Sequence, residues 1–296
     1  MRVAISGASG LIGSALVPAL ESAGHDVVRL VRHEPSGPRE IAWNPVDGTI
    51  DTAALAGVDA FVNLSGATIG RRWSGRRKAE ILESRVAATG LLARTAAELE
   101  PQPSVLVNAG GVGIYGDRGD EILTEGSTLG SGFLADVGVA WEAAAEPARS
   151  AGVRVVSFRQ GIVLTRRGGA LERLVTPFKL GVGGRVGSGR QWWSWLALDD
   201  SIAAFRFALE SDLAGAVNLA SPNPATNAQL VKALGRALHR PAVFPLPAFA
   251  VKAAFGEMGK EALLEGQRAL PARLLDAGFT FRYPELDAAL EHALES

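Results

Sequence analysis

The chain of 296 residues contains no cysteine. This absence excludes disulfides, thiolate metal sites and a cysteine nucleophile. Histidine is also scarce, and no two of the four histidines stand at the spacing of metal ligands, so we expect no metal centre. Only two tyrosines are present, Tyr115 and Tyr283, which limits the phenols available for proton transfer.

An excess of one charge is missing as well. Thirty basic and 31 acidic side chains give a formal net charge of −1, and no polybasic stretch fits a nucleic-acid backbone or an anionic membrane. The exception is the basic cluster 71–78. Because Glu80, Glu83 and Arg85 follow on the same predicted helix, a solvated helix entry near a cofactor is favoured over RNA binding.

Long apolar runs are absent too. No uncharged stretch approaches the roughly 20 residues that a membrane helix needs. The first predicted strand begins at the N-terminus, with no signal peptide before it. We therefore expect a cytoplasmic protein whose partner is a small-molecule substrate, with neither nucleic acid nor membrane as a partner. The oligomeric state cannot be predicted from these features.

The N-terminal stretch is the most informative part of the chain. Residues 2–6 indicate a buried strand and residues 11–23 an amphipathic helix, with glycines in the turn between them. Gly7 can take the tight turn, Gly10 lets the backbone approach a phosphate, and Gly13 lets the helix pack close to the strand. The free N–H groups of the helix start then face the anion. This order is typical of a dinucleotide-binding site.

Arg32 follows the second predicted strand, residues 27–31. A carboxylate at this place usually binds the ribose 2′-hydroxyl of NAD, whereas a guanidinium accommodates the 2′-phosphate of NADP. Arg32 therefore favours NADP(H) as the cofactor. Two alternatives stay open: Glu34 as the ribose ligand, and Arg32 as an ordinary surface charge.

Strands and helices alternate through the first half of the chain. Further strands are predicted at residues 60–64, 104–107 and 153–158, and helices at residues 76–100 and 139–150. This pattern predicts an α/β fold, a Rossmann-type doubly wound parallel sheet with helices on both faces. Ligands of such sheets collect at the carboxyl ends of the strands.

The second half begins with a change in composition. A glycine loop at residues 181–189 precedes an aromatic cluster at residues 191–195. We expect a smaller C-terminal substrate lobe here. The predicted domains are a Rossmann domain at residues 1–165 with a returning strand near 215–220, and a substrate lobe with a helical tail at residues 166–214 and 221–296.

Stretches along essentially the whole chain resemble the extended short-chain dehydrogenase/reductases. Within them, the chain is similar to an atypical group described as "epimerase family" or nucleoside-diphosphate-sugar epimerase-like proteins. Residues 6–13 match a motif of the whole superfamily. The Gly-Arg-Gln-Trp-Trp-Ser-Trp segment at 189–195 and the Ser-Pro-Asn-Pro-Ala-Thr-Asn loop at 221–227 look specific to the atypical group.

The predicted cofactor contacts come from the glycine turn and from this resemblance. In the turn and after the second strand they are Gly7, Ser9, Gly10, Leu11, Ile12 and Arg32. The resemblance places Leu64, Ser65 and Gly66 on the adenosine side, Glu80 and Arg85 reaching it from the following helix, and Val163 near the nicotinamide. Among these, Arg85 has the strongest physical reason, because a buried guanidinium needs an anion.

The catalytic pattern of the superfamily is absent. Active members use a Tyr-x-x-x-Lys pair on a helix, in which the tyrosine relays a proton and the lysine lowers its pKa. No tyrosine of this chain is followed by lysine four residues later. If Glu142 is aligned with the acidic residue after that lysine, the pair falls near Leu134 and Gly138. The usual serine then falls at Gly110 or Gly111.

Two candidate proton donors remain. Tyr115 is one if its phenol faces the nicotinamide, and Asp136 is the other if burial disfavours its charged form. Tyr115 as a packing and turn element, and Asp136 as a helix cap, are the alternatives.

Candidate substrate contacts are Gly111, Arg190, Trp193 and Trp195. The tryptophans line an apolar pocket or belong to the core of the lobe, and at least one of the cluster must pack inward. Arg190, with Lys179 and Arg185, either binds an anionic substrate such as a nucleotide diphosphate or is solvated.

Two functions are consistent with these residues. The first is an NADP(H)-dependent oxidoreductase or epimerase that acts on a small carbonyl or sugar-like substrate with a non-standard acid. The second is a non-catalytic NADP(H)-binding redox sensor or scaffold. The missing catalytic pattern favours the second, whereas the preserved site architecture favours the first, and we favour the enzyme.

Overall fold

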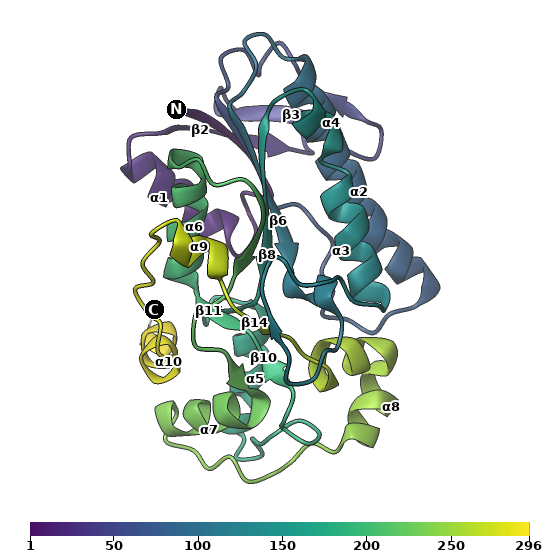
Figure 1. Ribbon diagram of the computed structural model, residues 1–296, viewed down its shortest axis with the longest axis vertical. Coiled ribbons are helices and arrows are strands. Elements are labelled where there is room, and N and C mark those ends of the chain that lie inside the picture. The colour runs from purple at the N-terminus through teal and green to yellow at the C-terminus, as the bar shows by residue number, and fades with distance from the viewer. Residues whose placement is uncertain (296) are drawn as a thin grey trace.

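A twisted sheet of eight strands runs through the upper part of the computed structural model, which describes residues 1–295 (Figure 1). Its strands are β1 (Arg2–Ser6), β2 (Asp26–Val31), β3 (Glu40–Asn44), β4 (Thr49–Ile50), β5 (Ala60–Asn63), β6 (Val105–Gly111), β8 (Arg154–Gln160) and β12 (Gly215–Leu219). The order across the sheet is β12-β8-β6-β5-β1-β2-β3-β4, and every pair except β3–β4 is parallel.

The chain reverses direction across the sheet between β1 and β5. It moves outward from β1 through β2 and β3, and then returns to the other side of β1 to form β5. In doubly wound sheets this switch point is where ligands bind. The predicted Rossmann-type fold is confirmed.

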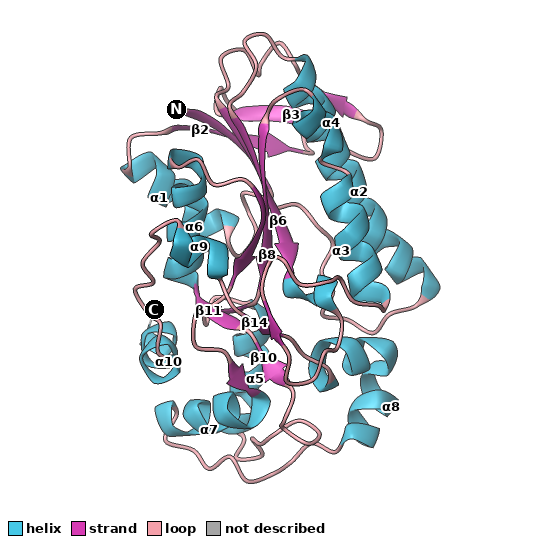
Figure 2. Ribbon diagram, in the orientation of Figure 1, coloured by secondary structure: helices cyan, strands magenta, loops and turns pink. Residues whose placement is uncertain are grey.

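Helices cover both faces of the sheet (Figure 2). One face packs on α1 (Gly13–Ser22) and α6 (Leu198–Glu210), and the other on α2 (Gly75–Glu98) and α4 (Glu146–Ser150), with α3 (Phe133–Ala143) beside α2. Both faces are therefore dry, which explains why the central parallel strands are rich in buried apolar residues.

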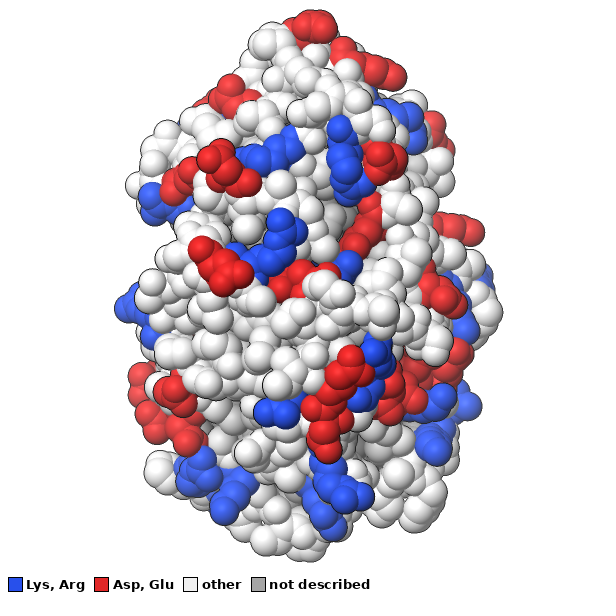
Figure 3. Space-filling view, in the orientation of Figure 1, with Lys and Arg blue, Asp and Glu red and all other residues white. Residues whose placement is uncertain are grey.

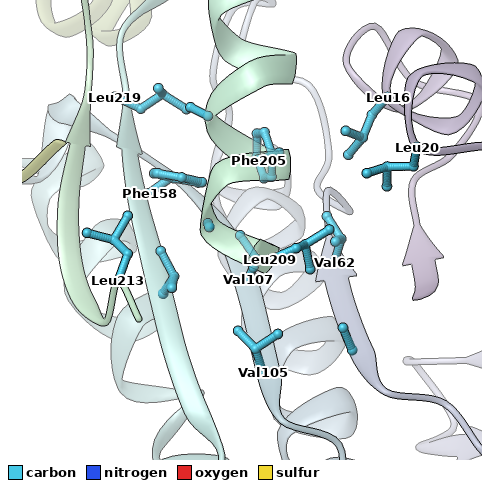
Figure 4. Packing of buried hydrophobic residues seen from close by; sticks show 14 of the residues in the cluster. Leu16, Leu20, Val62, Val105, Val107, Phe158, Phe205, Leu209, Leu213 and Leu219 are labelled. Atoms are coloured by element: carbon cyan, nitrogen blue, oxygen red, sulfur yellow. The ribbon is translucent and has the colours of Figure 1, made fainter. Parts of the chain in front are cut away.

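Figure 4 shows the first of these two apolar layers. Leu16 and Leu20 of α1 and Phe205 and Leu209 of α6 meet Val62, Val107, Phe158 and neighbouring strand residues in one cluster. The rings of Phe158 and Phe205 contact edge to face, with centroids 4.9 Å apart. This layer fixes the sheet on which the site is built.

The second lobe is assembled from three short strand pairs and the helices around them. The pairs are β9 (Ile162–Leu164) with β11 (Trp195–Ala197), β10 (Trp192–Trp193) with β13 (Ala225–Thr226), and β7 (Ile122–Leu123) with β14 (Arg268–Ala269). The helices are α5 (Gly169–Lys179), α7 (Asn227–Ala237), α8 (Ala248–Gly259), α9 (Ala272–Asp276) and α10 (Leu286–Glu295), with a 3₁₀ turn η1 (Val112–Tyr115) and a π turn η2 (Lys260–Leu264).

Several elements differ from the sequence predictions. The expected helix at 139–150 is two helices, α3 and α4, and α3 begins at Phe133. The expected strand at 104–107 continues as β6 to Gly111. Strands β3 and β4 were not predicted, because the buried residues of β3 alternate with half-buried ones and form no continuous apolar run, and β4 has only two residues. Among residues 1–295, no helix combines the length and the apolar character needed to span a bilayer.

Candidate functional site

The glycine turn lies at the switch point, between the ends of β1 and β5. Gly7 has a φ of 69°, and a Cβ on it would lie 2.8 Å from the Leu64 backbone carbonyl. A Cβ on Gly13 would lie 2.3 Å from the Gly7 carbonyl oxygen. Both positions therefore require glycine, the first for the turn and the second for helix packing. Gly10 is exposed, and its N–H donates to Gly7 O at 2.9 Å.

A buried polar network holds the strand ends beneath this turn. The Ser6 hydroxyl donates to Asn63 Oδ1 at 2.6 Å, and the Asn63 amide donates to Asn108 Oδ1 at 2.7 Å. Thr89 of α2 accepts from Asn63 and from the Trp141 indole of α3, both at 2.8 Å. The network ties the ends of β1, β5 and β6 to two helices, which makes the edge of the sheet rigid. We did not predict it, although polar residues at three apolar strand ends were a visible signal.

Arg85 reaches the same edge from α2. Its guanidinium donates to the carbonyls of Ala67 at 2.9 Å and Ile81 at 3.0 Å, and lies 4.8 Å from the centre of the Trp141 ring. A Cβ on Gly66 would lie 3.1 Å from its Cζ. Burial, with a smaller effect of Arg77, lowers the pKa of Arg85 to about 10.

No ion pair within residues 1–295 involves Arg85. A buried cation without a carboxylate is unfavourable by itself. The structure therefore presents an electropositive point beside Gly66, which is exposed, and near Leu64 and Ser65, which are half-buried.

The other predicted cofactor residues are arranged around this point. Arg32 is exposed at the end of β2, and its side chain makes no hydrogen bond or ion pair with the described part of the chain. Glu34 is exposed in the following loop. Glu80 is also exposed and pairs with Arg77 at 2.5 Å. The remaining residues are Ser9, which is exposed, and Leu11, Ile12 and Val163, which are half-buried.

The basic cluster 71–78 contacts the C-terminal lobe. Arg72 donates to the Ala253 carbonyl at 2.8 Å, and Lys78 pairs with Glu257 at 2.8 Å. These cations hold the lobe against the Rossmann domain, which agrees with the predicted helix entry.

The positions of the missing Tyr-x-x-x-Lys pair are filled by close packing between α3 and η1. A Cβ on Gly138 would lie 2.8 Å from Ile114 Cβ, so no lysine fits there without a shift. A Cβ on Gly113 would lie 3.1 Å from Leu134 Cβ. The conventional catalytic groups are therefore replaced by an apolar contact.

Tyr115 is sealed inside the protein. It has no exposed surface, and its hydroxyl lies 2.7 Å from Asn218 Oδ1 and 3.0 Å from the Thr124 carbonyl oxygen, and accepts from Arg159 at 2.9 Å. Burial raises the pKa of Tyr115, while the bond from Arg159 opposes the rise. This geometry contradicts the expectation that the phenol faces a nicotinamide. It agrees with the alternative, in which Tyr115 is a packing and turn element.

The Arg159 guanidinium completes this buried cluster through Glu142 of α3, at 2.8 and 2.9 Å. Burial alone would lower the pKa of Arg159, but the bonds to Glu142 and Tyr115 outweigh it and raise that pKa above its ordinary value. The pair fixes α3 on β8.

Asp136 does not meet the condition set for a proton donor. It is exposed in the first turn of α3, so the burial that would favour its neutral form is absent. It does not cap the helix either. The N–H groups of Phe133 and Leu134 instead donate to the carboxylate of Glu261, at 3.1 and 2.9 Å. Glu261 lies in η2 of the C-terminal lobe, and no local pattern in the sequence indicated this contact.

The predicted substrate contacts are spread over different environments. Gly111 is half-buried at the end of β6, and Arg190 is exposed. Trp193 and Trp195 belong to the core of the lobe, with 4% and 0% of their surface exposed, so the expectation that they line a pocket is wrong. Trp192 is the half-buried member of the cluster, and its indole donates to Asp120 at 2.7 Å.

The comparisons with known proteins define the class. The chain belongs to the NAD dependent epimerase/dehydratase family, whose model matches residues 3–220. A second model, described as a domain of unknown function (DUF1731), matches residues 246–293. The family resemblance expected from the sequence is confirmed.

Individual relatives are similar over the full length. The epimerase family protein Mb2239 of Mycobacterium bovis is 47% identical over 98% of this chain and 97% of its own. The crystal structure of human epimerase family protein SDR39U1 (isoform 2) with NADPH has a TM-score of 0.92 and 37% identity, covering 100% of both chains. A nucleoside-diphosphate sugar epimerase from Corynebacterium glutamicum has a TM-score of 0.81 and 38% identity, covering 99% of this chain and 58% of that one.

Proposed function

We propose that this chain binds NADPH at the carboxyl ends of β1, β2 and β5. The observation that carries the proposal is Arg85, a half-buried guanidinium that has no carboxylate partner within the described chain and stands beside Gly66. The human relative whose crystal structure contains NADPH supports it. In this proposal the Rossmann domain of residues 1–165 and 215–220 holds the cofactor, and the lobe of 166–214 and 221–296 holds a small-molecule substrate.

Each predicted cofactor residue then has a role. The glycine turn, Gly7 and Ser9 to Ile12, lies against the pyrophosphate and binds it through those backbone N–H groups that are free; the N–H of Gly10 is bound to Gly7 O. Arg32 binds the 2′-phosphate, and residues 64–66 line the adenosine. Arg85 faces an anionic group of the cofactor, Glu80 keeps Arg77 in place, and Val163 packs near the nicotinamide.

The proposed reaction class is oxidoreduction or epimerisation of a small carbonyl or sugar-like substrate. The cofactor supplies or accepts the hydride, so the chain must orient it and arrange one proton transfer. That proton does not come from a tyrosine on α3, because Leu134 stands at that position. We also leave Tyr115 and Asp136 out of the proton path, because one is sealed and the other is solvated.

A second function is favoured by the packing of α3. Leu134 and Gly138 are in close contact with η1, which leaves no space for the conventional pair. This observation favours a non-catalytic NADP(H)-binding redox sensor or scaffold.

Cofactor titration tests the proposal. Charge-assisted bonds to the 2′-phosphate contribute about 1.5 to 3 kcal/mol, so NADPH should bind roughly 10- to 150-fold more tightly than NADH. Arg32→Ala should remove most of this preference. Arg29→Ala, which changes an exposed arginine of the same strand, should preserve it. Equal affinity of the unaltered protein for the two cofactors would contradict the assignment.

A substrate panel separates the two functions. Carbonyl compounds and nucleotide sugars are offered with NADPH, and cofactor oxidation or epimer formation is followed. Turnover supports the enzyme. Tight NADPH binding without turnover of any compound favours the sensor or scaffold.

A further inference from the structure

Two stretches of the C-terminal lobe carry charge of only one sign. Residues 173–198 and 213–256 contain no aspartate or glutamate, and each stretch carries four lysines or arginines. The chain as a whole is nearly neutral, with a net charge of −1. The basic residues are dispersed along the sequence, so they form no polybasic motif, and the fold brings these two stretches together.

Contacts between the two stretches define this surface. Phe244 N donates to Gly183 O at 3.1 Å, and Leu246 N donates to Arg185 O at 2.8 Å. A Cβ on Gly235 of α7 would lie 3.5 Å from the ring of Phe178 in α5. The loops after α5 and α7 therefore lie side by side at the lower end of the molecule (Figure 1).

Large apolar side chains are exposed on these loops and at the start of α8. We call this surface the lobe tip. The exposed fractions of its apolar residues are 73% for Leu180, 54% for Val182, 65% for Val243, 55% for Phe244 and 76% for Phe249. Apolar side chains that gather in this way mark an interaction site more often than single exposed residues do.

Basic side chains surround the apolar residues. The exposed ones are Lys179, Arg185, Lys232, Arg240 and Lys252, while Arg236 pairs with Asp287 of α10 at 2.5 Å. At its lowest part the molecule shows white and blue surface (Figure 3). Four basic residues, Lys232, Arg236, His239 and Arg240, line a cavity of about 560 Å³ beside the apolar loops.

We propose that the lobe tip docks on the surface of an anionic phospholipid bilayer. Exposed phenylalanine and leucine side chains on loops can enter the acyl boundary, while surrounding cations meet lipid phosphates. The basic cavity is large enough for a phosphate headgroup. This docking is peripheral and needs no membrane-spanning helix. It departs from the expectation that no membrane is a partner, which was based on the absence of a polybasic stretch in the sequence. The docking stands independently of the proposed cofactor binding, because the lobe tip shares no residue with that site.

Sedimentation with vesicles tests the docking. The full chain should sediment with phosphatidylglycerol-containing vesicles, less so at high salt, and not with phosphatidylcholine alone. Each basic residue near an anionic surface contributes about fivefold to binding, so Lys232→Gln with Arg240→Gln should weaken it roughly 30-fold. Phe249→Ser should weaken it about tenfold, because an inserted aromatic ring is lost.

Matched controls use exposed residues elsewhere in the fold. Arg29→Gln with Arg94→Gln removes two charges from β2 and α2, and Val46→Ser removes an apolar side chain that is 85% exposed. These variants should bind vesicles like the unaltered protein. NADPH affinity should be the same in every variant, which verifies the fold and separates this test from that of the proposed function.

Several results would overturn the inference. Absence of vesicle binding, equal binding to both lipids, or full binding by the lobe-tip variants would each reject it. If polyglutamate binds the tip and vesicles do not, the partner is an acidic protein and the lipid assignment is wrong.

Discussion

Arg85→Met offers the sharpest test of the candidate site, because it should act in opposite directions on stability and on cofactor binding. Burial lowers the pKa of Arg85 from its ordinary value to about 10. One pKa unit corresponds to about 1.4 kcal/mol, so the charged side chain destabilises the protein without cofactor by roughly 3 kcal/mol. The unfolded chain holds this proton more tightly. The penalty is therefore complete at neutral pH and fades as pH rises from about 10 toward the ordinary pKa of arginine.

The substitution also removes favourable contacts. The bonds to the Ala67 and Ile81 carbonyls and the contact with the Trp141 ring together offset about 2 kcal/mol of that penalty. We therefore expect Arg85→Met to stabilise the protein without cofactor by about 1 kcal/mol, and to raise its Tm by roughly 2 °C.

Cofactor binding should change in the other direction. Loss of a charge-assisted contact should weaken NADPH binding by about 1.5 to 3 kcal/mol, or roughly 10- to 150-fold. Thermal unfolding with and without NADPH, together with calorimetric titration, measures both effects. Arg94→Met, on the exposed side of the same helix, should alter neither. If Arg85→Met lowers the Tm and leaves NADPH affinity unchanged, Arg85 supports the fold and is not a cofactor residue.

Two further substitutions test the roles assigned around α3. Tyr115→Phe should lower the free energy of unfolding by about 1 to 3 kcal/mol in urea denaturation, because buried partners lose the hydroxyl. Any turnover per folded molecule should fall by much less than the roughly 100-fold expected for a general acid, and a larger loss would restore Tyr115 as the proton donor. Glu261→Ala should lower the free energy of unfolding by about 1 kcal/mol, because α3 loses its cap. Glu257→Ala, which breaks an exposed pair with Lys78, should have a smaller effect, and equal losses would contradict the capping role.

The sheet was predictable wherever burial imposes a pattern on the sequence. Strands β1, β2, β5, β6 and β8 are covered on both faces over most of their length and so contain short runs of buried apolar residues. Strand β3 alternates between buried and half-buried residues, and β4 has two residues, so neither gives such a run. The start of α3 was missed for another reason. Its N-cap is Gly132, which has no side chain to accept a hydrogen bond, so the usual Ser, Thr, Asp or Asn signal is absent.

The candidate site also contains residues whose roles the sequence predicts and others whose roles depend on distant contacts. The glycine turn could be predicted because Gly7 and Gly13 satisfy local steric demands. The burial of Tyr115 could not be predicted, because its hydroxyl is bound by Arg159 and Asn218, which are 44 and 103 residues away in the chain. The packing of the tryptophan cluster could be predicted only in part. Its spacing required at least one ring to pack inward, but only the lobe's packing shows that Trp193 and Trp195 do so while Trp192 remains half-buried.

The contact of Glu261 with α3 connects the packing of this helix with the position of the C-terminal lobe. In this chain the helix that would carry the catalytic pair packs against η1 through small and apolar residues, and its free N–H groups are bound by the C-terminal lobe. Any separation of the lobe from the sheet at this point would leave two amide donors without their partner, at a cost of about 0.5 to 2 kcal/mol. The same segment is held by Lys78 through Glu257. The residues matched by the domain of unknown function thus have a physical task here: Glu261 of η2 binds the free N–H groups at the start of α3.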